Sequence, residues 1–168
     1  MQGGVVVSVL TTQEVASVLN HLIKADRDVC EEFKIASRDA RSISVQRALT
    51  EFARGSRSRV RELQTVVSGL GESAAMEGTL GSWLHRGWTN FRNRFSRQSE
   101  HAILEYCMTY LESAIDNYLD ALDQDLPNVV RTIVEREFAD MRAAHDLIDA
   151  ELSASFAHVA IDQVTGHP

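Results

Sequence analysis

Apolar residues recur every three or four positions along four stretches of the chain, a spacing that predicts amphipathic α-helices. The first stretch begins after Thr11 and Glu14, whose spacing is typical of a capping box at a helix start, and runs to about Arg38. The second follows residues 39–42 and ends at Gly69, since glycine favours the conformation adopted just past a helix C-terminus.

Two further helices are predicted in the second half of the chain. The third begins near Ser99, a residue type suited to an N-cap, and runs to about Asp123. The fourth opens at Asp125–Pro127, where an acidic cap is followed by a proline in the first turn, and continues to about Val159. Each helix has one apolar stripe, which is the pattern of a four-helix bundle.

The lengths of the connections predict the topology. Short links join the first helix to the second and the third to the fourth, so each pair should form an antiparallel hairpin. Leu70 to Gln98 is long enough to travel the length of the bundle, which lets the second and third helices run parallel. We therefore expect an all-α, ferritin-like four-helix bundle as a single domain over residues 11–159, with an N-terminal extension (1–10) and a flexible tail (160–168).

Composition narrows the classes of function. The 168 residues carry a formal net charge of −7, which argues against general nucleic-acid binding. Cys30 and Cys107 fit no metal-binding spacing and are interpreted as buried thiols rather than a disulfide. No apolar run reaches the length of about 20 residues that a membrane span needs, and the start does not resemble a signal peptide. A cytoplasmic location is therefore expected.

The segment between the second and third helices reverses the overall sign of the charge. No acidic residue occurs from Gly78 to Ser99, whereas this stretch holds several arginines and both tryptophans. Its apolar residues recur at helical spacing, so a short amphipathic helix is predicted. The favoured interpretation is that this helix covers apolar surface of the bundle or of a second subunit, and the alternative is that it lies on an anionic membrane. The predicted interaction surface consists of Trp83, Leu84, Arg86, Trp88, Phe91, Arg92 and Phe95.

The stripes contain few residues that could bind metal. A di-iron bundle needs a Glu from each of two helices and a Glu-x-x-His from each of the other two. In this chain Arg142 stands three residues before His145, and Thr65 stands three residues after Glu62, so neither pair completes the motif. Glu31 and Glu32 are expected on the outer flank of the first helix. A complete di-metal site is therefore not predicted.

Asp26 and His145 are the polar residues within otherwise apolar stripes. A buried carboxylate is costly without a partner, so the two could pair across the core. The more common role of an inward-facing histidine is a hydrogen-bonded core residue rather than a ligand. Asp26, Glu62 and His145 remain weak candidates for a site that binds iron or another divalent metal, and no cofactor is expected.

The chain resembles a family of uncharacterised bacterial ferritin-like four-helix-bundle proteins over about Val15 to Leu152. The resemblance is carried by four short segments, which are Leu19–Ile23, Arg61–Leu63, Leu84–Trp88 and Arg142–Asp146. It implies a ferritin-like fold but no settled activity. Glu62 and His145 match the family pattern. Family members tend to carry acids near Cys30, Gly55 and Leu111, and their replacement here puts any inherited metal chemistry in doubt.

Three functions remain open from the sequence. The leading hypothesis is a non-catalytic bundle, dimeric and stress-related or partner-binding, that acts through the basic aromatic crossover. The second is a divergent ferritin-like metal-binding protein or oxidase. The third is a peripheral membrane protein that uses the same crossover. The chain is expected not to be an enzyme.

Overall fold

The computed structural model describes residues 10–78 and 100–165, with side chains described as far as residue 154. Within these ranges the chain forms the helices α1 (Thr12–Asp39), α2 (Ile43–Gly69), α4 (Glu100–Leu122) and α5 (Asn128–Thr165). These correspond to the four helices that the apolar spacing predicts. Three predictions lie outside the described residues: the N-cap at Ser99, the short amphipathic helix and the crossover surface from Trp83 to Phe95.

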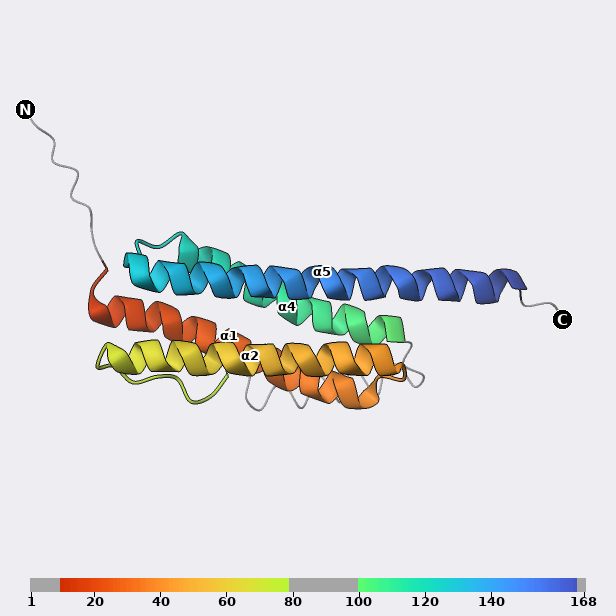
Figure 1. The fold of residues 1–168 in the computed structure, drawn as a ribbon, viewed down its shortest axis with the longest axis horizontal. Helices are drawn as coiled ribbons and strands as arrows, with labels where there is room; N and C mark the ends of the chain where they lie inside the picture. The colour runs from red at the N-terminus through yellow and green to blue at the C-terminus, as the bar shows by residue number, and fades with distance from the viewer. Residues whose placement is uncertain (1–9, 79–99, 166–168) are drawn as a thin grey trace, which may run out of the picture.

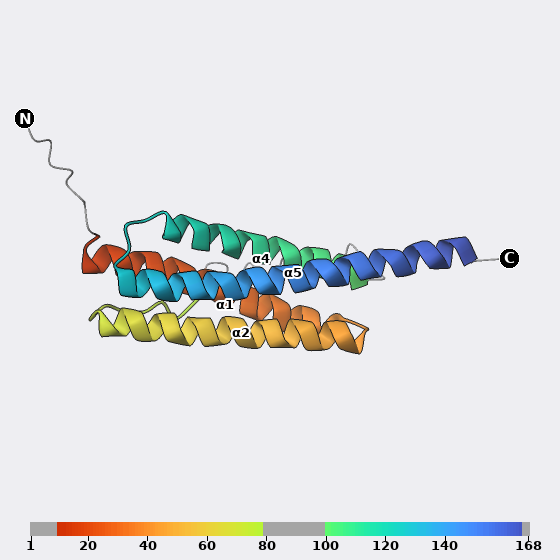
Figure 2. The same ribbon diagram turned by 45° about the horizontal axis from the view of Figure 1, so that its top comes forward.

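The helices form two antiparallel hairpins, α1 with α2 and α4 with α5 (Figure 1). In both ribbon views α1 and α5 run in one direction and α2 and α4 in the other (Figure 2). α2 therefore ends and α4 begins at opposite ends of the bundle (Figure 1), as the length of the connection between them predicts. This order and direction confirm the ferritin-like topology.

The four helices do not pack equally. α1 packs closely against both α2 and α4, and α4 packs against α5, but the contact between α2 and α5 is sparse. α1 is therefore buried on two sides and has a wider buried face than a helix with one close neighbour. The candidate site described below lies on the side of the bundle where α2 and α5 make few contacts.

The predicted stripes form the core. The largest fully buried side chains include Phe33 of α1, Leu63 of α2, Tyr118 of α4 and Met141 of α5. Burial of a large apolar side chain contributes about 1.5–3 kcal/mol, so the stripes supply the main driving force for assembly. Cys30 and Cys107 are free and buried, as predicted.

The start of α1 and the end of α2 follow the predicted capping chemistry, whereas α5 begins at Asn128, so Pro127 precedes its first turn rather than lying in it. The side chain of Thr11 accepts a hydrogen bond from the backbone N–H of Glu14, and the Glu14 carboxylate accepts one from the backbone N–H of Thr11 at 2.8 Å. Both partners of the capping box are thus present. α2 ends at Gly69, and Gly71 adopts a φ of 78°, which is the left-handed conformation that glycine tolerates best.

The predicted end of the fourth helix was too early. α5 continues past Val159 to Thr165, so residues 160–165 are helical rather than part of a loose tail. The physical reason is that no helix-breaking residue occurs before Gly166 and Pro168. α5 extends beyond the ends of the other helices (Figures 1 and 2). Despite this length, none of the described helices is long and apolar enough to span a membrane.

Candidate functional site

Five polar side chains meet in the middle of the bundle and are called here the core charge network: Asp26, Ser56, Arg59, Tyr118 and Glu137. The Nε of Arg59 donates a hydrogen bond of 2.8 Å to Asp26, and its Nη2 donates one of 2.7 Å to Ser56. The Tyr118 hydroxyl lies 2.7 Å from Asp26 Oδ2 and 3.1 Å from Glu137 Oε2. Each of the four helices therefore contributes to one buried polar cluster.

Asp26 is fully buried and has two hydrogen-bonding partners from other helices. Burial raises the pKa of Asp26, because the charged form loses its hydration, while Arg59 and Tyr118 act in the opposite direction. Burial alone would lower the pKa of Arg59, but the charge of Asp26 raises it overall, so the guanidinium stays protonated. The pair thus forms a charged link between α1 and α2.

Glu137 is the less satisfied carboxyl of the core charge network. Its Oε2 is hydrogen-bonded to Tyr118, but its buried Oε1 has no hydrogen-bond partner within the described residues. Burial, reinforced by the charge of Asp26, raises the pKa of Glu137 to about 8. At neutral pH most molecules therefore carry this carboxyl in its protonated form.

Glu32 was predicted on the outer flank of the first helix, and that prediction was wrong. Its side chain is 0% exposed, whereas its neighbour Glu31 is exposed as expected. The reason is the wide buried face of α1, which packs against α2 and α4 at once. Burial raises the pKa of Glu32 to about 7, partly offset by the Tyr106 hydroxyl. Neither carboxylate oxygen makes a hydrogen bond of ordinary geometry in the described part of the chain.

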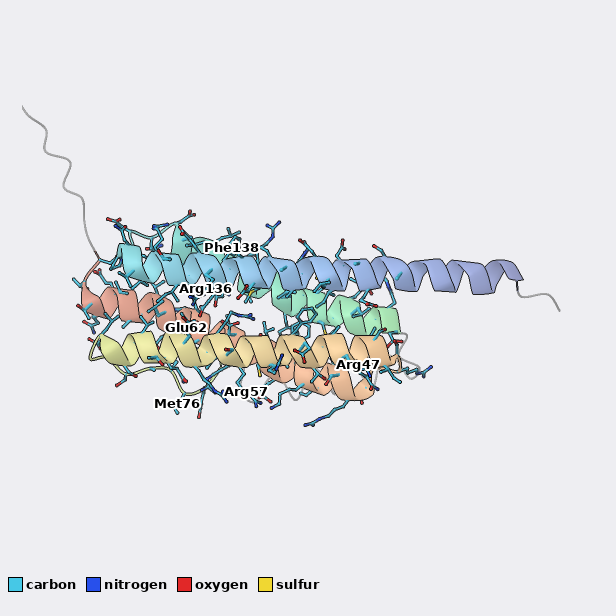
Figure 3. The ribbon with its side chains drawn as sticks, in the orientation of Figure 1. Arg47, Arg57, Glu62, Met76, Arg136 and Phe138 are labelled. Carbon is cyan, nitrogen blue, oxygen red and sulfur yellow. The ribbon has the colours of Figure 1, made fainter. Side chains whose placement is uncertain are left out.

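A groove of about 320 Å³ lies between α2 and α5 and reaches the core charge network. We call it the α2/α5 groove. Ser56, Arg59 and Glu137 line its buried end, and the ion pair between Glu62 of α2 and Arg136 of α5 lines it nearer the surface. Figure 3 shows this pair facing each other across the space between the two helices. The other lining residues are Val29, Phe33, Glu51, Phe52, Gly55, Ser58, Leu111, Asp140, Ala143, Ala144 and Leu147.

Two larger cavities lie on the other sides of α1. One, of about 660 Å³, is lined by three arginines of α1 and α2 and by Gly78. The other, of about 490 Å³, lies between α1 and α4 beside Tyr106 and Tyr110, whose hydroxyls are 3.0 Å apart. Neither is lined by a member of the core charge network. The α2/α5 groove is therefore the candidate site, since it alone among these three is lined by members of the core charge network.

The three weak metal candidates are not brought together as a cluster. Asp26 is held by Arg59 and Tyr118, and Glu62 is ion-paired with Arg136 at the surface. His145 is 29% exposed and lies 3.5 Å from Asp146 of its own helix. Asp26 therefore has Arg59 as its charged partner in place of His145, because Arg59 comes from α2, the helix packed most closely against α1.

The donor set in the core does not fit a di-metal centre. Such a centre uses inward carboxylates from four helices with two histidines, so that negative ligands balance the metal charge. Here the core charge network holds two carboxyls, one of which a guanidinium already balances, and the fully buried Glu32 lies outside this network. Within residues 10–78 and 100–165, no group of three His, Cys, Asp or Glu side chains is arranged to hold a metal ion.

Arg59 and Glu137 are the candidate-site residues that the sequence pattern did not identify. Glu137 follows the stripe residue Val134 by three positions and precedes Met141 by four, so its inward direction could have been read from the helical spacing. Arg59 is adjacent to the stripe residue Val60, and its direction depends on the rotation of α2, which the spacing leaves uncertain by one residue.

Comparison with known proteins gives a family and a fold. The family model described as "Domain of unknown function (DUF2383)" matches residues 14–124. Among solved structures, a two-domain protein from Anabaena variabilis with DJ-1/ThiJ/PfpI-like and ferritin-like domains is similar, with a TM-score of 0.71 at 10% identity. The match covers 89% of this chain but 39% of that one, so this chain spans about two-fifths of its length. No curated protein sequence matches.

Proposed function

Because the chain belongs to the DUF2383 family of ferritin-like helical proteins, whose description assigns no activity, we propose from its own residues that it is a non-catalytic, partner-binding bundle. The observation that carries the proposal is the position of Arg59 in the core charge network. A guanidinium paired with Asp26 supplies the positive charge that a metal ion supplies in a di-iron bundle. The centre of the bundle is then a structural element rather than a reactive one.

The sequence supports the crossover, residues 79–99, as the partner-binding part. It holds both tryptophans and no acidic residue, in a chain whose net charge is −7. Tryptophan and arginine are enriched where protein surfaces bind one another. A second copy of this chain is the partner that we propose, because its acidic surface complements the basic crossover.

The homodimer is tested by light scattering on the full chain and on a variant with Trp83→Ala and Trp88→Ala. The expected result is a dimer for the wild type and a monomer for the variant. Val129→Ala serves as the control, since Val129 is exposed on α5 and is not part of residues 79–99. A wild type that is monomeric at all concentrations, or a variant that stays dimeric, would contradict the proposed surface.

The alternative function is a divergent metal-binding protein. It is favoured by one observation: both carboxylate oxygens of Glu32 and Oε1 of Glu137 are buried without a hydrogen-bond partner of ordinary geometry in the described chain. Elemental analysis of protein purified without chelator separates the two functions. Less than about one-tenth of a metal ion per chain is expected, and more than about half would overturn the non-catalytic proposal.

Co-sedimentation with vesicles, with and without anionic lipid, tests membrane binding, which is expected to be absent.

A further inference from the structure

The core charge network holds more carboxyls than cations. Asp26 and Glu137 are its two acids, and Arg59 is its one cation. Nε of Arg59 is hydrogen-bonded to Oδ1 of Asp26 at 2.8 Å. Glu137 instead has the Tyr118 hydroxyl as its hydrogen-bonding partner. Buried polar atoms are almost always hydrogen-bonded, so the unpartnered Oε1 of Glu137 calls for an explanation.

Glu137 lines the buried end of the α2/α5 groove, although its side chain is only 1% exposed. A small group that entered the groove would therefore meet this carboxyl at the innermost point. The groove is at the small end of the range typical of ligand sites, about 300–1,000 Å³. Its volume suits a molecule of a few heavy atoms rather than a peptide or a lipid.

The walls of the groove are partly apolar and aromatic. Phe33 and Phe52 pack with their ring centroids 5.9 Å apart, and Phe52 is partly exposed on the groove side of α2. Leu147 of α5 is 60% exposed, which is unusual for a leucine that lines a cavity. These side chains offer a surface for the hydrocarbon part of a ligand.

The charges that line the groove favour a cation. Its two arginines are already paired, Arg59 with Asp26 and Arg136 with Glu62. Glu137 and Asp140 form no ion pair within the described residues, and the lining holds four carboxyls against two guanidiniums, so its balance is acidic. A ligand with a positive charge would supply the partner that the carboxyl of Glu137 lacks.

We propose that the α2/α5 groove binds a small organic ammonium ion, with its alkyl part against Phe52 and Leu147 and its ammonium group at Oε1 of Glu137. An ammonium donates up to three hydrogen bonds and requires no preformed set of ligands. A metal ion fits less well, because no three metal-ligating side chains converge in the described chain. This site is independent of the proposed partner surface.

Binding is coupled to a proton at Glu137. The groups that face this carboxyl are Asp26 from α1, Arg59 and Glu62 from α2, and Tyr118 from α4, with Arg136 and Asp140 beside it on α5. Burial and the charges of Asp26 and Glu62 favour its protonated form, whereas Tyr118 and Arg59 act in the opposite direction. An ammonium ion favours the ionised form. Binding therefore releases a proton near neutral pH, and the affinity rises as the pH approaches about 8.

Isothermal titration calorimetry of the full chain with hexylammonium chloride tests the site, with 1-hexanol and hexanoate as matched probes. The wild type should bind hexylammonium at least about tenfold more tightly than either probe, and about tenfold more tightly at pH 8 than at pH 6. Titrations in two buffers of different ionisation enthalpy should show proton release. Glu137→Gln should weaken binding at least about tenfold, and Glu135→Gln, which alters an exposed acid of the same helix, should not.

Glu137→Gln should fold, since it removes a buried ionisable group, and circular dichroism verifies this. The proposal is overturned if hexylammonium does not bind, if 1-hexanol binds as tightly, or if the folded Glu137→Gln variant binds as well as the wild type. It is also overturned if only divalent metal ions bind at Glu137. Failure of this site would leave the dimer measured by light scattering unchanged, so the two proposals fail separately.

Discussion

The Nε of Arg59 on α2 lies 2.8 Å from Oδ1 of Asp26 on α1, and both side chains are buried in the closest helix pair of the bundle. Removing two such groups from water is costly, and their attraction offsets that cost only while both are present. Tyr118 adds a hydrogen bond to Oδ2 of Asp26, and Ser56 accepts one from Nη2 of Arg59. The stability of the α1/α2 hairpin should therefore depend on the pair as a unit.

Arg59→Met should lower the free energy of unfolding by about 3–5 kcal/mol, because it leaves the carboxylate of Asp26 buried without a counter-charge. Adding Asp26→Asn to this variant should restore much of the loss, and urea denaturation measures both. Arg54→Met is the control, since the pair of Arg54 with Glu51 is exposed and is expected to contribute less than about 1 kcal/mol. Equal losses for Arg59→Met and Arg54→Met would show that the buried pair has no special role.

The capping box at the start of α1 makes a separate contribution. Thr11→Ala removes the side chain that accepts the hydrogen bond from the backbone N–H of Glu14. We expect a loss of about 1 kcal/mol in the free energy of unfolding. Thr11→Ser retains the hydroxyl and should stay within a few tenths of a kcal/mol of the wild type on the same scale. An alanine variant as stable as the serine variant would argue that the first turn of α1 does not contribute.

The two thiols should differ in reactivity. Cys107 is fully buried in the core, and burial raises its pKa strongly, so little thiolate forms. Cys30 is also buried, with a pKa raised mainly by burial, but it lines the cavity of about 660 Å³ beside α1 and α2. In native protein, an aromatic disulfide reagent should modify Cys30 slowly and Cys107 more slowly still. Single Cys→Ala variants assign the two rates, and faster modification of Cys107 would contradict the packing of α4.

The helices, their order and most of the core were predictable from local patterns. The spacing of apolar residues identified all four helices, and the connection from Leu70 to Gln98 identified the topology. These features depend on short-range chemistry or on chain length. The end of α5 was missed because no helix breaker occurs before Gly166, so the helix could continue past the last clear stripe residue.

The candidate site was predicted only in part, because it depends on helix rotation and on neighbours. Asp26 was identified from its stripe, but its partner Arg59 lies next to the stripe of α2 and becomes buried through close packing with α1. Glu32 was wrongly predicted on the outer flank of α1, because a pattern with one apolar stripe does not show that this helix packs on two sides. The inward direction of Glu137 could be predicted from its helical spacing to Met141. Its unpartnered oxygen, in contrast, follows only from three-dimensional packing.

Stability should fall as the pH rises from about 5 to 9. Burial raises the pKa of Glu32 to about 7 and that of Glu137 to about 8, both above the ordinary value of 4.5. Between about pH 4.5 and pH 8 the folded chain thus binds more protons than the unfolded chain. The stabilisation from the two protonated carboxyls is therefore complete below about pH 4.5 and is lost as the pH passes 7 to 8. Asp26, whose pKa burial also raises, acts in the same direction.

For Glu32 alone the loss is on the order of 3 kcal/mol. Urea denaturation of the wild type at pH 5.5 and pH 8.5 should therefore show a clear decrease in the free energy of unfolding. The double variant Glu32→Gln with Glu137→Gln should flatten this dependence, because glutamine does not titrate. Glu31→Gln with Glu135→Gln removes the same number of charges at exposed positions and should leave the slope unchanged. If the exposed pair flattened the profile as much as the buried pair, general charge repulsion rather than burial would explain it.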